Sequence, residues 1–145
     1  MTPSEAALEA ARLISVQGLA KGALQDDEGR LCHNGAVYLA ATGSASALAC
    51  QGDDSVYLAL EVIGRSSLIL EREGTSTLPH MVNDEQGTSA EDIILLLKEN
   101  AALDDDPEAL AEIARRREAG MYNSIPVLIP PAFLAASSKW GILAC

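Results

Sequence analysis

Residues 80–92, HMVNDEQGTSAED, hold the side chains of this sequence that could most readily do chemistry. His80 is followed by Asp84 and Glu85, so an imidazole and two carboxylates could form a general acid–base set or bind a metal ion. The HExxH motif is absent, as are a nucleophile–base signature and a phosphate-binding loop. We therefore predict no catalytic residues, and keep a small enzyme or metal-binding protein that uses this loop as an alternative.

The same stretch has the features of a turn that leads into a helix. The segment NDEQG, residues 83–87, is rich in residues that favour turns. Thr88 stands three residues before Glu91, which is the spacing of a capping box. Ser89 and Asp92 offer the same arrangement one residue later. We favour this interpretation, in which the polar side chains satisfy the free N–H groups of a helix start.

Two other groups of potential metal ligands lack the spacing that metal sites need. The possible zinc ligands of the sequence are Cys32, His33, Cys50 and His80, but the paired C-x2-C and H-x3-H spacings of zinc sites are missing. The acidic residues 26–28 do not follow the D-x-D-x-D-G pattern of a calcium loop, and we predict a solvated turn there. We therefore expect neither a metal site nor a cofactor.

The composition limits the elements that can position these residues. The chain has 145 residues, which is one ordinary domain, and is 48% hydrophobic but only 3% aromatic, so its core is expected to be aliphatic and helical. A net charge of −11 argues against a nucleic-acid partner. Three irregularly spaced cysteines argue against a disulfide scaffold. No signal peptide or clean transmembrane segment is apparent, so we expect a cytoplasmic or virion protein.

Hydrophobic periodicity and capping residues predict a mostly α fold of about five helices. These helices are expected over residues 3–17, 32–43, 55–73, 90–103 and 107–119. Two strands, over 56–63 and 67–72, remain the alternative for the third segment, because Val, Ile and Tyr also favour sheets.

The last two predicted helices differ in character. The segment 90–103 contains five successive apolar residues, 93–97, and is predicted to be the central helix. The segment 107–119 is expected to bury Leu110, Ile113 and Ala114, and to expose the arginines 115–117 at its end.

Two segments of the sequence carry a resemblance to a known family. The segments CHNGAVYLAATG (32–43) and VNDEQGTSAEDIILLLKENA (82–101) resemble a small family from actinobacteria and their phages that has no assigned function. The matching residues are Gly22, Ala23, Leu24, Cys32, Gly35, Ala36, Asn83, Asp84, Gly87 and Thr88 or Ser89, whereas Val82 stands where the family often has tryptophan. The resemblance implies a small soluble helical protein and supplies no reaction. We expect Cys32 to be a small buried side chain and not a reactive thiol.

The composition changes abruptly after residue 120, so we divide the chain into a helical domain, 1–120, and an apolar C-terminal arm, 121–145. The arm carries one charge, Lys139, and its prolines 126, 130 and 131 forbid a continuous helix. An extended arm can dock on a partner subunit, or it can cover its own core. The residues expected to bind a partner are Ile125, Val127, Leu128, Ile129, Phe133, Leu134, Trp140, Ile142 and Leu143. A membrane anchor is disfavoured, because the prolines leave backbone groups unpaired in lipid.

These observations predict a non-enzymatic structural or interaction protein that binds a protein partner or itself through the arm. A phage virion accessory, such as a capsid decoration or adaptor protein, would fit the resemblance. A further alternative is a precursor peptide whose C-terminal end, with Ser137, Ser138 and Cys145, is the modified part.

Overall fold

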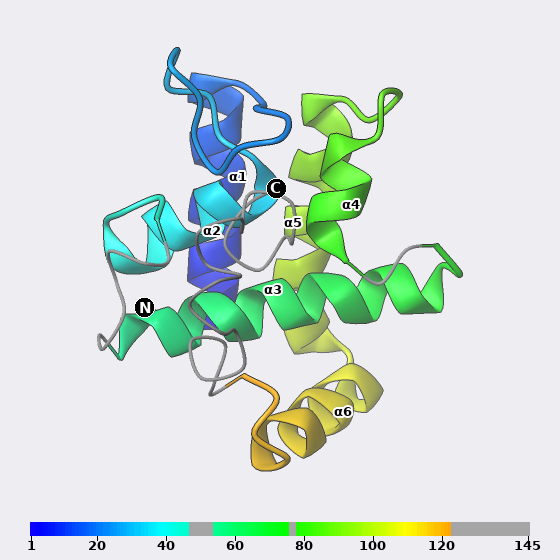
Figure 1. Cartoon of the computed structure of the whole chain (residues 1–145). Helices are drawn as coiled ribbons and strands as arrows, with labels where there is room; N and C mark the ends of the chain where they lie inside the picture. Colours follow the sequence, from blue (N-terminus) through cyan, green and yellow to red (C-terminus); the bar gives the residue numbers. More distant parts are fainter. Residues whose placement is uncertain (47–53, 76–77, 123–145) are drawn as a thin grey trace, which may run out of the picture.

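The computed structural model describes residues 1–46, 54–75 and 78–122 (Figure 1). Within them the chain forms six α-helices and one 3₁₀ turn: α1 (Pro3–Gln17), α2 (His33–Thr42), α3 (Ser55–Arg72), α4 (Pro79–Asp84), α5 (Ala90–Ala102), η2 (Leu103–Asp105) and α6 (Pro107–Glu118). The prediction of a mostly helical fold is confirmed. The third predicted segment is one helix and not two strands.

Helix starts follow the predicted capping residues. Thr2 Oγ1 accepts a hydrogen bond from the backbone N–H of Glu5 at 3.1 Å, and the Glu5 carboxylate accepts one from the Thr2 N–H at 2.9 Å. At α5, Ser89 and Asp92 form the same reciprocal pair, with distances of 3.3 and 2.9 Å. Of the two capping boxes that the sequence offered, the structure therefore forms the second. Asp106 caps α6 by accepting from a backbone N–H in its first turn.

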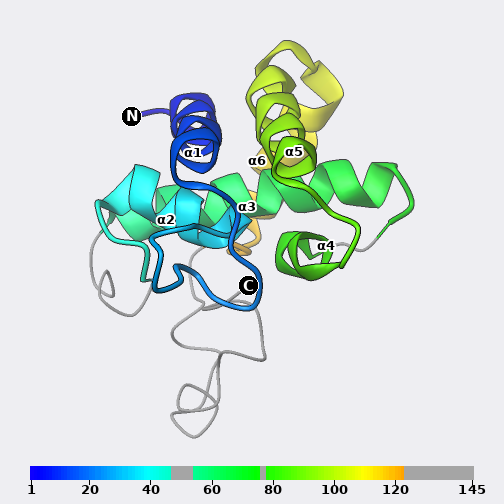
Figure 2. The same cartoon turned by 90° about the horizontal axis from the view of Figure 1, so that it is seen from above.

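Helix α3 organises the fold. It contacts α1, α2, α4, α5 and α6, whereas α1 and α5 lie side by side across it (Figures 1 and 2). The prediction that 90–103 is the central helix is wrong, because Leu95 of α5 is 56% exposed and only one side of that helix is buried. The five successive apolar residues of α5 suggested a helix that is buried on all sides, but one of them, Leu95, points to solvent.

The core is aliphatic, as predicted, and is built from small residues on α1 and larger ones on α3 and α5. The face of α1 that carries Ala7, Ala10, Ala11 and Ile14 is buried. Small side chains there allow α2 and α5 to approach α1 closely. One aromatic ring, that of Tyr38, is fully buried in α2.

Two local expectations are corrected. Helix α4 was not predicted, because its residues Pro79–Asp84 fall in a segment that reads as a turn, and tertiary contacts with α2 and α3 hold it. In α6, Leu110 is 38% exposed, and Ala109 and Ile113 are the buried residues. Adjacent residues of an α-helix lie about 100° apart around its axis, so a helix that buries Ala109 turns Leu110 toward solvent.

The packed part of the chain includes residue 122. Tyr122 is buried, and a Cβ atom added to Gly64 of α3 would stand only 2.2 Å from its ring. Gly64 is therefore needed for the close approach of this ring, even though glycine weakens a helix. Arg116 also joins this corner, because it donates to Glu71 of α3 at 2.6 Å and to Glu112 at 2.9 Å, so it is not the solvated arginine that we expected.

Candidate functional site

The motifs of the sequence resemblance meet in one place, where the loop between α1 and α2 crosses α4. Lys21, in this loop, donates from Nζ to the backbone carbonyl oxygens of Asn83, Glu85 and Thr88, at 2.5, 2.7 and 2.8 Å. Three carbonyl groups at the end of α4 and in the following turn are thereby satisfied by one ammonium group. We call this set of contacts the loop–α4 junction.

Asn83 is the buried centre of the loop–α4 junction. Its Oδ1 accepts from the backbone N–H of His33 at 2.8 Å, and its Nδ2 donates to the carbonyl oxygen of Ala20 at 2.9 Å. The first contact satisfies a free N–H group at the start of α2, and the second holds the loop. A buried amide that pairs a donor and an acceptor from two different segments fixes the geometry of both.

The predicted acid–base residues have structural roles in this junction. Asp84 Oδ1 accepts from the backbone N–H of Gly22 at 3.0 Å, and Glu85 is exposed and contributes a backbone carbonyl to Lys21. His80 lies one turn before Asp84 on α4, and partial burial lowers the pKa of its imidazole, while the Asp84 carboxylate acts in the opposite direction. The structure therefore brings His80 near Asp84, commits the Asp84 carboxylate to a hydrogen bond with the loop, and leaves the Glu85 side chain exposed.

Cys32 and Gly35 complete the junction from the side of α2. Cys32 is the N-cap residue, and its Sγ accepts from the Gly35 N–H at 3.2 Å. A Cβ atom on Gly35 would stand 1.9 Å from the carbonyl oxygen of Leu24, so only glycine fits. Cys32 is buried, as expected, but it is disulfide-bonded and not a free thiol. The other two cysteines, Cys50 and Cys145, lie outside the described residues.

The metal-ligand sets that the sequence analysis weighed are not assembled in the part of the chain that the structure describes, where no group of three or more His, Cys, Asp or Glu residues could hold an ion. Cys50, one of the pooled zinc ligands, is not described. In the acidic turn, Asp26 accepts from the backbone N–H groups of Glu28 and Arg30, at 3.0 and 2.9 Å. These bonds stabilise a tight turn and confirm the structural interpretation.

A second buried polar feature runs from α2 through α3 to α5, and sequence reasoning missed it. Asn100 Nδ2 donates to the Val62 carbonyl oxygen and to Ser66 Oγ, both at 2.8 Å, and Ser66 Oγ lies 2.8 Å from Nε2 of His33. The Asn34 side-chain oxygen can only accept, so the Nδ1–H of a neutral His33 ring donates to it at 2.9 Å. Nε2 of the same ring is then an acceptor, and the Ser66 hydroxyl donates to it.

Burial keeps His33 neutral. The side chain is fully buried, and desolvation is the main cause that lowers its pKa from the ordinary 6.5 to about 4. A hydrogen bond with Asn34 opposes the shift, and the nearby His80 adds to it. The two hydrogen bonds of the ring fix one tautomer, and full burial keeps the ring away from any substrate. These are the properties of a histidine with a structural role.

The hydrogen-bond network of His33, Ser66 and Asn100 continues to the surface through Arg65. Its guanidinium donates from Nη2 to the Asn100 carbonyl oxygen at 3.0 Å and to Asp104 Oδ1 at 2.9 Å, and Asp104 also pairs with the Ser4 hydroxyl of α1. The Arg65 side chain is 3% exposed and that of Asp104 52%. Arg65 Nε and Asn100 Oδ1 are buried and have no partner within the described residues.

The sequence does contain a signal for this buried hydrogen-bond network. Ser66 lies on the helical face of α3 that also carries Ala59 and Val62, and Asn100 follows Ile93 and Leu97 on the buried face of α5. Polar residues on apolar faces predict a buried hydrogen-bond network, but their partners come from distant segments and only the fold identifies them.

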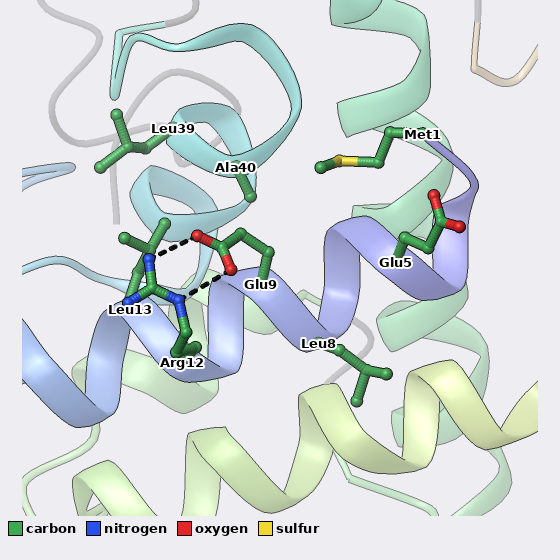
Figure 3. A pocket seen from close by; sticks show the side chains of 8 residues that line it. All are labelled: Met1, Glu5, Leu8, Glu9, Arg12, Leu13, Leu39 and Ala40. Atoms are coloured by element: carbon green, nitrogen blue, oxygen red, sulfur yellow. Dashed lines mark hydrogen bonds and ion pairs between the residues drawn. The ribbon is translucent and has the colours of Figure 1, made fainter.

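A broad, open groove of about 800 Å³ lies over α1 and the end of α2 (Figure 3). Apolar side chains line most of it, among them Leu8, which is 49% exposed, and Leu39. Arg12 and Glu9 form a two-pronged ion pair beside it, with distances of 2.6 and 2.8 Å. Glu5, which also lines the groove, accepts from the Thr2 N–H, so the surface that the groove offers to a ligand is mainly apolar.

The residues predicted to bind a partner lie outside the described residues, from Ile125 to Leu143. Among the helices that the structure describes, none combines the length and the apolar character needed to cross a membrane.

The fold and these sites define a small helical protein whose buried polar residues act mainly on its own architecture. The chain belongs to a family of unknown function, DUF6197, whose match covers residues 1–103. That range includes every residue of the loop–α4 junction, and also Asn100 of the buried hydrogen-bond network. No curated protein and no solved structure is significantly similar to it.

Proposed function

We propose that this protein is a non-enzymatic interaction protein whose C-terminal arm docks on a protein partner. The observation that carries this proposal is the attachment of the arm. Tyr122 is buried against Gly64 of α3, and the 23 residues that follow it carry a single charge, that of Lys139. A segment of this composition needs cover from water, and its tether on the α3–α6 corner fixes the place from which it starts.

The roles of the polar residues support a non-enzymatic function. His33 is buried and neutral, Asp84 accepts a hydrogen bond from the loop, and the ion pair beside the α1–α2 groove is satisfied by its own two members. Groups that are committed in this way do not supply a base or a nucleophile to a substrate.

The sequence resemblance to a family of actinobacteria and their phages suggests where the protein acts. In that setting the protein is a virion accessory, such as a capsid decoration or adaptor, that is made in the cytoplasm and joins a particle through its arm. The high acidity of the domain supports this role, since repulsion between acidic bodies disfavours uncontrolled aggregation of copies that carry an apolar arm.

The test replaces apolar residues of the arm in the full-length chain. The double variant Ile129→Asp and Phe133→Asp is expected to lose self-association or partner binding, measured by light scattering at several concentrations, and to keep the helical circular dichroism. The matched control is Val16→Asp/Tyr57→Asp, which also adds two acids, at side chains that are 70% and 44% exposed on α1 and α3. If the arm variant instead lowers the melting temperature as a core substitution does, the arm covers its own domain and the proposal is wrong.

A further inference from the structure

Helix α6 is attached to the rest of the fold by few buried side chains. It lies beyond α3 at the edge of the molecule, and its main contacts are with α3 and the adjoining η2 (Figure 1). Its buried side chains are Ala109 and Ile113, whereas α5, which has 13 residues against 12, buries four. The family match, which ends at residue 103, leaves α6 out. Because most of the stability of a helix in a protein comes from its packing, α6 is held less firmly than α5.

Three ion pairs join α3 to α6 and its N-cap, and each of them reaches the surface. The pairs are Arg72–Asp106, Glu71–Arg116 and Glu61–Arg117. The exposed fractions of the side chains of Asp106, Glu71 and Arg117 are 38%, 37% and 56%. Ion pairs between exposed charges are screened by salt, and each contributes little by itself. The attachment of α6 to α3 is therefore expected to weaken as the ionic strength rises.

The ring of Tyr122 closes the contact after the end of α6. It is buried in the notch that Gly64 leaves on α3, where a Cβ atom would stand 2.2 Å from the ring. The Tyr122 hydroxyl is also buried, and it has no hydrogen-bond partner within the described residues. A buried hydroxyl without a partner loses its hydration, so this closed contact includes an unfavourable contribution that opening would remove.

The chain is anchored immediately before this unit. Leu103 is buried, and the carboxylate of Asp104 accepts from the Arg65 guanidinium at 2.9 Å and pairs with the Ser4 hydroxyl. These contacts hold η2 to α1 and α3. Asp105, the next residue, is exposed. The anchored part therefore ends at Asp104, and the backbone can pivot at the following residue.

We propose that residues 106–122 form a strap that opens from α3 as one unit while helices α1–α5 stay packed. Opening uncovers the notch at Gly64 together with the carboxylates of Glu61 and Glu71, and salt shifts the strap toward the open form. Units that bury few apolar side chains open at a lower free energy than the whole domain. The strap lies within the helical part of the chain, so this inference goes beyond the proposed function and does not depend on what the arm binds.

Amide hydrogen exchange of the full-length chain tests the strap, in about 0.05 M and about 1 M sodium chloride. The amides of α6 are expected to exchange faster than those of α5 at both concentrations. Their exchange is expected to rise roughly tenfold with salt, because three partly exposed ion pairs are screened together. The amides of α1 and α5 are expected to keep their protection, since the contacts between these two helices do not involve the strap.

Two arginines of α6 provide a matched pair of variants. Arg117 is 56% exposed and pairs with Glu61 of α3, whereas Arg115 is 63% exposed and pairs with Glu112 of α6 itself. Arg117→Gln is expected to raise the exchange of α6 several-fold, and Arg115→Gln much less. Tyr122→Ala is expected to raise it further and to leave the exchange of α5 unchanged, because the ring then no longer holds α6 to the notch.

Three results would overturn the inference. Amides of α6 that exchange as slowly as those of α5 in both salt concentrations would mean that α6 opens only with the whole domain. An equal loss of protection in α5 and α6 of Tyr122→Ala would make α6 part of the same cooperative unit as the core. Equal effects of Arg117→Gln and Arg115→Gln would show that the pair with Glu61 does not hold the strap. The arm variant Ile129→Asp/Phe133→Asp tests the proposed function separately, because it leaves all contacts of the strap with α3 intact.

Discussion

Acidification should destabilise this protein through His33 before its carboxylates respond. His33 is neutral in the native state because it is buried, with a pKa of about 4, whereas an unfolded chain binds a proton near pH 6.5. Its folded-state pKa is the lower one, so the unfolded state takes up the proton first as the pH falls. The stability is complete above pH 6.5, declines between pH 6.5 and 4, and levels off below that.

The size of the effect follows from the gap between the two pKa values. At about 1.4 kcal/mol per pH unit, the gap corresponds to a loss of about 3 kcal/mol, of which about 2 kcal/mol is expected between pH 7.5 and 5. The carboxylates whose pKa values are lowered, such as Asp104 and Glu112, affect stability chiefly below about pH 5, where unfolded carboxyl groups take up protons. Between pH 7.5 and 5 the histidines therefore dominate the loss of stability, and Glu99, whose pKa is raised by burial, opposes it.

Urea denaturation, followed by circular dichroism at pH 7.5, 6.5, 5.75 and 5, measures this loss. His33→Gln removes the titrating group and is expected to flatten the pH dependence, whatever it costs at pH 7.5. His80→Gln is the matched control and should keep most of the slope, because His80 is only partly buried. Since the first variant could fail to fold, the His33 ring resonances of the wild type provide a second measurement and should not titrate above pH 5. Equal slopes in the wild type and His33→Gln, or a His33 ring that titrates near pH 6.5, would refute the reasoning.

Three further predictions concern the junction, the tether of the arm and the helix cap. Asn83→Ala leaves the His33 N–H and the Ala20 carbonyl unpaired, and is expected to lower the free energy of unfolding by about 2–4 kcal/mol in the same denaturation assay. Gly64→Ala should destabilise the wild type, because the new Cβ meets the Tyr122 ring, but should stabilise a Tyr122→Ala background by up to about 1 kcal/mol; the same sign in both backgrounds would contradict the packing. Ser89→Ala should cost about 1 kcal/mol and Thr88→Ala much less, and the reverse order would mean that the other capping box forms.

Local chemistry made much of the secondary structure predictable. Helix starts at Thr2, Ser89 and Asp106 depend on residues three positions apart, and the helical period of α1 depends on residues within one turn or two. Helix α4 was missed for the same reason, because its stability comes from α2 and α3 and not from its own sequence. The candidate site was predictable as a set of residues, since the motifs around residues 22–36 and 83–89 were recognised, but not as an arrangement.

The sequence by itself determined that the chain is helical, aliphatic and acidic, and that its residues after 120 are almost uncharged, because these properties depend on residue types and short spacings. Only the tertiary structure decided that Asn83 bonds to the start of α2, that His33 is linked through Ser66 to Asn100, and that Gly64 admits Tyr122. Each of these contacts joins segments that are far apart along the chain. Their partners are selected by the packing of helices in three dimensions, which no local pattern of residues records.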